Sequence, residues 1–445
     1  MSSRTLTPRH SRRWAARAAA VGLVAAMAAT AVPAVSFGAP AAGGGPHSTP
    51  VRGLTLPKPT GPHQVGIVDL HLVDAARPNP WTASPAYREL MASVYYPARD
   101  TAGRTRAAQF PAGTAAAFDQ LNAGELGLPS GLVDWASTRT WAYREAPAAT
   151  APRGGFPVLL FSPGAGDPRG WDSTVAEDLA SRGFVVVTID PTYDASGVEF
   201  PGGRVETSVL PQLFAQAQQD GTVGDLLRKV VSVRADDATS VLDTLGRIAA
   251  GHAPAGAALP AGLAGSLDLG RVGMYGQSAG GSTAAQAMYQ DRRIKAGIDL
   301  DGILEYAGEP TPGAPLMSSA ANGIDRPFLL MGSQSADGES LASDPSWRAF
   351  YDNERGWVRD VTMAGSRHVS YTDAESLVPQ LARALGPTVL PPSTVTDDVG
   401  TIRPARAVSL EETYVAAFFD RWLRGGHDPI LDGTSPTYPE MLFQH

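Results

Sequence analysis

The feature that most constrains the fold of this chain is the alternation of strand-like and helical segments along most of its length. Short runs rich in branched apolar residues predict buried strands at residues 65–74, 92–98, 156–164, 184–190, 271–276, 294–302, 326–333 and 357–365. Helical segments lie between them, at 171–183 and, with apolar residues at helical spacing, over about 225–249. This alternation predicts an α/β fold with a mostly parallel central sheet and helices on both faces.

The N-terminal segment differs in composition from the rest of the chain. Residues 1–41 contain five arginines, no acidic residue and an alanine-rich apolar stretch that ends in small residues. This order predicts an export signal peptide, and SRRWAAR within it fits the twin-arginine pattern. A retained membrane anchor is the alternative, but Pro33 and the scarcity of leucine favour cleavage. We therefore expect a secreted, extracellular protein.

Charge and cysteine content exclude several classes of protein. The 36 basic residues include the five arginines of the signal, so 31 remain against 44 acidic residues, a formal net charge of −13. Such a chain is a poor ligand for nucleic acid or anionic membranes, and we expect neither as a partner. We also expect a monomer without stable membrane insertion after signal cleavage. The chain has no cysteine, which excludes disulfides, thiol catalysis and cysteine-ligated metals.

The remaining sequence predicts one catalytic domain over residues 63–445. Residues 42–62 are rich in glycine and proline and have no hydrophobic period, which predicts a flexible lead-in. Two segments, 191–224 and 250–268, interrupt the alternation of strands and helices. We interpret the first as a lid or pocket wall, with a plain surface excursion as the alternative.

Ser278 lies where a predicted strand passes directly into a predicted helix, in VGMYGQSAGGSTAA. A nucleophilic serine on such a sharp turn needs a glycine two residues before it and another two residues after it, because side chains there would clash. Gly276 and Gly280 supply them. In a chain with 48 glycines the spacing alone is weak, but the strand before and the helix after it make Ser278 a candidate nucleophile. A serine that caps an ordinary strand-to-helix turn is the alternative.

A serine hydroxyl needs a base to remove its proton. Only His368, His427 and His445 follow Ser278 in the chain, as the fold order of such hydrolases requires. His368 lies on a loop after a predicted strand, which is where open α/β sheets carry their chemistry, and it is the predicted base.

The residues leave the third member of the triad open between two aspartates. Asp301 ends the strand IKAGIDLDG, and Asp337 follows the next strand in FLLMGSQSADG. Either could orient the imidazole and stabilise its charged form. Asp299 alternates with Asp301 on the same strand but lies deeper in the sheet.

The tetrahedral intermediate of ester hydrolysis needs backbone N–H donors. One comes from the residue after the serine, Ala279, and the other from a loop after an earlier strand, for which FSPGAG makes Ala165 the candidate. A phosphate site at a helix N-terminus is the alternative for this loop. The chain has no P-loop motif, and GAG lacks the third glycine of a dinucleotide-binding fingerprint.

The stretch GQSAGGSTAAQAMYQDRRIKAGIDLDG resembles the nucleophile-to-acid segment of the platelet-activating-factor acetylhydrolase-type α/β-hydrolases. The resemblance covers about residues 63–385 and includes RELMASVYYPA, FSPGAG, VRADDATSVLDTL and GSRHVSYTD, while the tail from Ala405 is similar to exported actinobacterial relatives. It implies an α/β-hydrolase fold and ranks Asp337 second as the acid. The site residues that it implies are the nucleophile Ser278, the acid Asp301, the base His368 and the oxyanion donors Ala165 and Ala279.

The resemblance also implies a function, a serine ester hydrolase without metal or organic cofactor. Gln277 and Pro163 depart from the family, because they stand where it usually has histidines. SPG before the oxyanion residue also occurs in cutinase-like and polyester-degrading esterases, so the acetyl-phospholipid substrate is not carried over. We expect a secreted carboxylesterase or lipase-like enzyme that cleaves short or medium acyl esters.

Three other functions stay open at this point. A cutinase-like or polyester hydrolase would need an open aromatic groove, for which Trp171, Trp135 and Trp141 are candidates. Ordinary core or surface positions are the favoured alternative for these tryptophans. An amidase or peptidase would share the triad. A catalytically inactive secreted binding module would keep the fold without bringing the triad residues within reach of one another.

Overall fold

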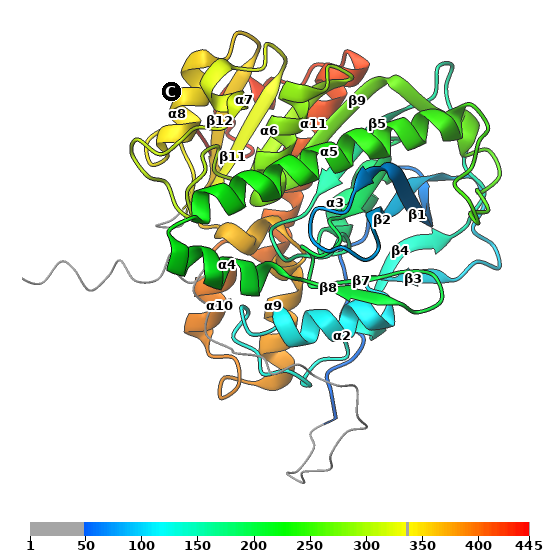
Figure 1. The fold of residues 1–445 in the computed structure, drawn as a ribbon, viewed down its shortest axis with the longest axis horizontal. Helices are drawn as coiled ribbons and strands as arrows, with labels where there is room; N and C mark the ends of the chain where they lie inside the picture. Colours follow the sequence, from blue (N-terminus) through cyan, green and yellow to red (C-terminus); the bar gives the residue numbers. More distant parts are fainter. Residues whose placement is uncertain (1–48, 335–337, 445) are drawn as a thin grey trace, which may run out of the picture.

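A computed structural model describes residues 49–334 and 338–444 of the chain. Its centre is an eleven-stranded sheet with the order β13-β12-β11-β10-β9-β5-β6-β2-β1-β4-β3, and β7 and β8 form a separate ribbon (Figure 1). The run from β6 to β12 in that order is parallel throughout. The strands are β1 (Gln64–Pro78), β2 (Tyr87–Ala98), β3 (Arg106–Ala108), β4 (Arg139–Arg144), β5 (Phe156–Ser162), β6 (Val185–Asp190), β7 (Gly197–Glu199), β8 (Val205–Thr207), β9 (Leu267–Gln277), β10 (Ile294–Leu300), β11 (Phe328–Ser333), β12 (Val358–Met363) and β13 (Met441–Gln444).

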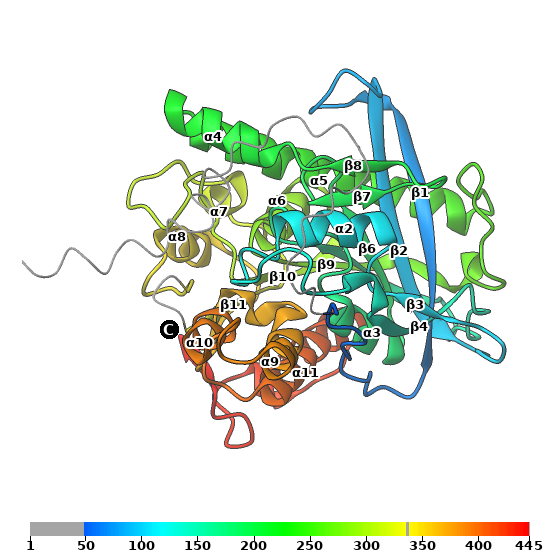
Figure 2. The same cartoon turned by 90° about the horizontal axis from the view of Figure 1, so that it is seen from below.

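Helices cover both faces of the sheet. The helices are α2 (Ala112–Leu121), α3 (Ser173–Ser181), α4 (Leu210–Asp220), α5 (Val223–Ala249), α6 (Ala279–Gln290), α7 (Ser318–Asn322), α8 (Pro345–Asn353), α9 (Ala374–Leu385), α10 (Pro392–Val399) and α11 (Pro404–Arg424). The apolar sides of α5 and α6 pack on one face, and those of α3 and α11 pack on the other (Figure 2). A third apolar cluster joins α2, α9 and α10 beyond one end of the sheet (Figure 1).

The buried strands explain why the sequence pattern was informative. The central strands β5, β6 and β11 are buried along their whole length, which is what strands covered on both faces require. Their sequences are therefore continuous apolar runs, and each predicted strand corresponds to a strand of the central sheet. Within the described residues, no helix has both the length and the apolar character that crossing a membrane requires.

The predicted flexible lead-in is wrong for its described part, residues 49–62. Leu54 and Leu56 are buried in the apolar cluster of α2 and α9, and the N–H of Thr55 donates to Gln380 Oε1 at 3.0 Å. Glycine and proline content did not reveal these contacts, because the cluster that receives the two leucines comes from distant parts of the chain. The predicted signal, residues 1–41, lies outside the described residues.

Buried carboxyl groups gather between α3, α9 and α11. Glu177, Glu375 and Glu412 are at most 4% exposed, and burial raises the pKa of each to about 8. The neighbouring carboxyl of Asp373 adds to the rise for Glu177 and Glu412. These side chains therefore stay protonated in the folded protein at pH 7.

This cluster predicts that the folded protein loses stability as pH rises from about 4.5 to about 8. The unfolded chain gives up these protons near the ordinary glutamate pKa of 4.5, whereas the folded chain keeps them until about 8, so the unfolded state gains relative stability in between. Thermal unfolding measured from pH 5 to pH 9 should show a falling Tm. Glu375→Gln should flatten the fall, while the exposed control Glu309→Gln should leave it unchanged. A Tm that rises over this range would contradict the interpretation.

Candidate active site

Ser278 alone makes the turn between the end of β9 and the start of α6. Its φ is 56° and its ψ is −124°, a conformation that residues with a side chain rarely adopt. The flanking glycines permit it, because a Cβ on Gly280 would overlap the carbonyl oxygen of Ser162 and a Cβ on Gly276 would overlap the backbone of Gly280. The turn predicted from the glycine spacing is thus present, and it presents a partly exposed serine.

His368 and Asp301 lie on the loops that follow β12 and β10. His368 Nδ1 is 2.8 Å from Asp301 Oδ2. Ser333 donates to the same carboxylate from its N–H and from its Oγ, both at 2.7 Å, and the N–H of Glu339 donates at 3.1 Å. These donors fix the direction of the carboxylate toward the imidazole. With Nδ1–H donating to Asp301, the neutral ring carries its lone pair on Nε2.

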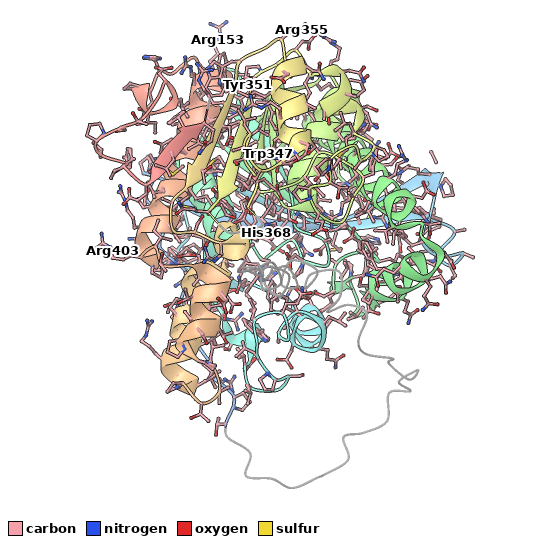
Figure 3. All side chains as sticks on the ribbon, turned by 90° about the vertical axis from the view of Figure 1, so that its left-hand side faces the viewer. Arg153, Trp347, Tyr351, Arg355, His368 and Arg403 are labelled. Atoms are coloured by element: carbon pink, nitrogen blue, oxygen red, sulfur yellow. The ribbon has the colours of Figure 1, made fainter. Side chains whose placement is uncertain are left out.

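Hydrogen bonds made by the triad residues, or by the residues next to them in the chain, bring the three predicted triad residues into one region. The N–H of Ser278 donates to the carbonyl of Leu300 at 2.8 Å, which places the serine beside the residue that precedes Asp301. Gln277 Nε2 donates to the carbonyl of His368 at 3.3 Å. Figure 3 shows His368 where the strands end, next to the layer that contains α2, α9 and α10. Gln277, a departure from the family pattern, thus links the nucleophile turn to the histidine loop.

Residues 163–166 follow β5 and form the loop predicted to hold the oxyanion. A Cβ on Gly164 would lie 2.6 Å from Gln277 Oε1, so the loop backbone packs closely against the nucleophile turn. Ala165 and Ala279 are both partly exposed. In the part of the chain that the structure describes, neither alanine N–H donates to another protein group. Two such donors beside the serine turn fit the requirement of a tetrahedral intermediate.

The segment 191–224 places an apolar wall beside the oxyanion loop. Leu210 and Phe214 of α4 are buried against Val230 of α5, and Ala165 packs on this cluster. The segment is therefore folded against the site. Its movement as a lid stays a prediction.

Asp299 differs from Asp301 although only one residue separates them on the strand. Its carboxyl is fully buried and accepts the N–H of Gly302 at 2.8 Å. Burial, with the charge of Asp301 nearby, raises the pKa of Asp299 well above its ordinary value. Asp299 thus has a structural position in which burial disfavours its charged form, and it lies deeper in the strand than Asp301.

Of the other candidates from the sequence, the described residue His427 does not take part in this arrangement. His427 lies at the surface, with Nε2 3.7 Å from Asp432. Asp337 and His445 lie outside the described residues. Among the residues that are described, no cluster of histidine, aspartate and glutamate has the arrangement of a metal site.

Sequence reasoning missed three charged residues around the oxyanion loop: Asp167, Asp194 and Arg234. Burial raises the pKa of Asp167 to about 7, while the nearby Arg234 and His368 lower it. Arg234 and Asp194 form a buried ion pair with an N–O distance of 2.6 Å. One signal was present in the sequence, because Arg234 and Asp237 are charged residues on the mostly apolar face of the predicted helix over 225–249.

The three tryptophans that were candidates for an aromatic groove have other packing partners. Trp135 and Trp171 are 1% and 4% exposed, and both pack against Phe118, with ring centroids 5.0 and 4.6 Å apart. Trp141 lies under the guanidinium of Arg106, at 3.9 Å from the ring centroid. Trp135 and Trp171 are thus core tryptophans, and Trp141 is partly buried.

Comparison with known proteins agrees with the predicted α/β-hydrolase fold. The family model described as platelet-activating factor acetylhydrolase, isoform II, matches residues 49–386. A protein of Arthroderma benhamiae described as a probable 1-alkyl-2-acetylglycerophosphocholine esterase is 27% identical over 401 residues, which cover 87% of this chain and 93% of that protein. The platelet-activating factor acetylhydrolase of Cavia porcellus is 27% identical over 57% of each chain. The solved structure of a ferulic acid esterase from Streptomyces cinnamoneus has a TM-score of 0.66 and 32% identity, covering 88% of this chain and 100% of that one.

The different environments of the two aspartates predict different results for the same substitution. Asp301→Asn should lower kcat for a p-nitrophenyl ester by about 10³–10⁴-fold, because the amide no longer favours the imidazole tautomer that accepts the serine proton. Asp299→Asn is the matched control and should keep kcat within about threefold, since an amide can still accept the Gly302 N–H. Equal losses in the two variants, or full activity of Asp301→Asn, would contradict the assignment.

Proposed function

Because this chain belongs to the platelet-activating factor acetylhydrolase, isoform II, family and is a carboxylic ester hydrolase, we propose that it works through a Ser278–His368–Asp301 triad. In the first half-reaction, Ser278 Oγ attacks the ester carbonyl carbon while His368 Nε2 accepts the hydroxyl proton. The carbonyl oxygen becomes an oxyanion that the N–H groups of Ala165 and Ala279 stabilise. The C–O bond to the alcohol then breaks, and His368 returns the proton to the departing alcohol.

The second half-reaction uses the same groups with water. His368 removes a proton from a water molecule, whose oxygen attacks the carbonyl carbon of the acyl-serine. The second oxyanion is stabilised by the same two N–H groups. Its collapse breaks the bond to Ser278 Oγ, which recovers its proton from His368, and the free acid leaves. No step requires a metal or an organic cofactor.

One observation carries this proposal, the linked set of hydrogen bonds around the serine turn. The carboxylate of Asp301 holds His368 Nδ1 at 2.8 Å, the N–H of Ser278 bonds the residue before Asp301, and Gln277 bonds the carbonyl of His368. A chance GQSAG turn would not collect an acid and a base at the ends of two other strands. This grouping also weighs against the alternative of an inactive binding module.

We propose short or medium acyl esters as the substrates. Support comes from the apolar cluster of α4 and α5 on which Ala165 packs, because its partly exposed members Trp81, Val223, Leu226 and Leu227 provide apolar surface for an acyl chain. The fungal relative is named for an acetyl ester and the bacterial structure for a ferulic acid ester. The buried positions of Trp135 and Trp171 give no support to a polyester-binding groove built from them.

We further propose that the protein is exported and acts as a monomer. The arginine-rich start and the apolar stretch of residues 1–41 support export. The large exposed apolar side chains in the described region are Val73, Tyr87, Leu121, Tyr289 and Leu442, which come from five different elements and so give no support to one extended interface.

Substitution of the nucleophile tests the proposed mechanism directly. Ser278→Ala should lower kcat for p-nitrophenyl butyrate by on the order of 10⁴–10⁶-fold, because no other group can form the acyl-enzyme. Ser282→Ala is a matched control on the next turn of α6, where the hydroxyl donates to the carbonyl of Ile303 at 2.6 Å. It should retain activity within about threefold. A Ser278→Ala protein that is as active as the wild type would refute the mechanism.

A panel of acyl groups tests the substrate proposal. We expect kcat/KM for p-nitrophenyl esters to be highest between acetate and octanoate and to fall toward palmitate. Release from a polyester film and cleavage of the matching anilide should both be slower than cleavage of the soluble esters. A preference for palmitate would indicate a long-chain lipase, faster film degradation a polyester hydrolase, and faster anilide cleavage an amidase.

Export can be checked by expressing the full chain in a secreting bacterial host. Protein recovered from the medium should begin near residue 42, and intact full-length protein confined to the cells would contradict the proposal. The double substitution Arg12→Lys with Arg13→Lys should block export if the twin-arginine route is used.

A further inference from the structure

A buried ion pair lies directly behind the oxyanion loop. Arg234 comes from the middle of α5, and Asp194 comes from the loop after β6. Their side chains are 2% and 1% exposed. Arg234 Nε lies 2.7 Å from Asp194 Oδ2, and Nη2 lies 2.6 Å from Oδ1, so the pair is bidentate.

The same guanidinium also binds the backbone of the loop. Arg234 Nη1 donates to the carbonyl of Pro163 at 2.5 Å, and Nη2 donates to the carbonyl of Gly164 at 2.9 Å. Arg234 therefore determines which way two consecutive carbonyl groups of the loop point. The carbonyl of Gly164 belongs to the same peptide group as the N–H of Ala165, and the carbonyl of Pro163 belongs to the peptide group before it.

Asp194 holds the other side of the same residue. Its Oδ1 accepts the N–H of Gly166 at 3.1 Å. The peptides before and after Ala165 are thus fixed by one ion pair, the first through its carbonyl and the second through its N–H. In a trans peptide the N–H points opposite to the carbonyl. Because the carbonyl of Gly164 points toward Arg234, the N–H of Ala165 points away from the ion pair.

The energetics favour a positional role over a general stabilising one. Removing two charges from water costs several kcal/mol, and their attraction in the interior often only offsets that cost. An apolar pair in this place would pack as well, but it could not direct three backbone groups at once. Arginine is required because its planar fork reaches the carboxylate and the loop carbonyls together, which a lysine ammonium cannot do.

We propose that Arg234 and Asp194 are positioning residues that aim the Ala165 N–H at the oxyanion. This inference rests on the proposed function, in which Ala165 is one of the two oxyanion donors. Neither residue touches the substrate. Their effect is transmitted through the loop at residues 163–166, and it is felt in the transition state, where the carbonyl oxygen becomes charged.

The chain contains a matched control on the same helix. Asp237 lies one turn after Arg234 on α5 and forms a buried ion pair with Arg88, whose Nη2 lies 2.6 Å from Asp237 Oδ2. Arg88 also donates to a backbone carbonyl, that of Thr192, at 2.8 Å. Both pairs are buried and anchor the loop after β6, but none of the hydrogen bonds of Asp237 or Arg88 within the described structure reaches residues 163–166.

The test compares kcat and KM of Arg234→Lys, Arg234→Met and Asp194→Asn with those of Asp237→Asn, using p-nitrophenyl butyrate. Variants at Arg234 should lose about 10²–10³-fold in kcat, as enzymes do when one oxyanion donor is lost, with KM within about threefold. Asp194→Asn should lose less, because an amide oxygen can still accept the Gly166 N–H. Asp237→Asn should lower Tm but keep kcat within about threefold.

Affinity for a boronic acid that forms a tetrahedral adduct supplies a second measurement that a purely structural role would not move. It should fall in parallel with kcat in the Arg234 variants, while binding of the butyrate product stays unchanged. If Arg234→Met does not fold, Arg234→Lys and Asp194→Asn still decide the question. Full kcat in the folded variants, or an equal loss in Asp237→Asn, would overturn the proposal. Full activity of the Ser278→Ala variant would instead refute the proposed function itself.

Discussion

The constraint on which the rest of the site depends is the close backbone approach between the end of β5 and the start of α6. The carbonyl oxygen of Ser162 occupies the space that a side chain at Gly280 would need. This contact fixes the oxyanion loop relative to the serine turn. It is possible because β5 and β9 are parallel neighbours, so their carboxyl ends meet at one edge of the sheet. The positive φ of Ser278 is a local cost that the surrounding packing offsets.

A second constraint is that the buried carboxyl groups near that edge have different surroundings and therefore different tendencies to ionise. Asp301 accepts hydrogen bonds from Ser333 and from the backbone of Glu339, and it faces His368. The side chain of Glu339 has a pKa raised to about 11, by burial first and by neighbouring carboxyls second, and Asp299 is shifted in the same direction. The charged form of each is therefore disfavoured. Asp301, by contrast, is the carboxylate that contacts His368 Nδ1, where it can stabilise an imidazolium ion.

The sequence predicted the features that local spacing determines. The central strands, the long helix α5, the turn at Ser278 and the loop position of His368 follow from short patterns. The roles of Gln277, Asp194 and Arg234 do not, because their partners lie tens of residues away along the chain and become neighbours only after the sheet has formed. The residues alone left Asp301 and Asp337 near parity, since each follows a strand, and only the family resemblance ranked them. The burial of Leu54 was missed for the same long-range reason.

In the proposed mechanism, Ser278 Oγ reacts with the ester, and the N–H groups of Ala165 and Ala279 stabilise the negative charge that develops on the carbonyl oxygen. A crystal structure of the protein after reaction with an alkyl phosphonate inhibitor tests it most directly, because the phosphonyl oxygen imitates the oxyanion. We expect phosphorus bonded to Ser278 Oγ, the phosphonyl oxygen within about 3 Å of both N–H groups, and His368 Nε2 beside the serine oxygen. An adduct on another residue, or a phosphonyl oxygen that faces solvent, would contradict it.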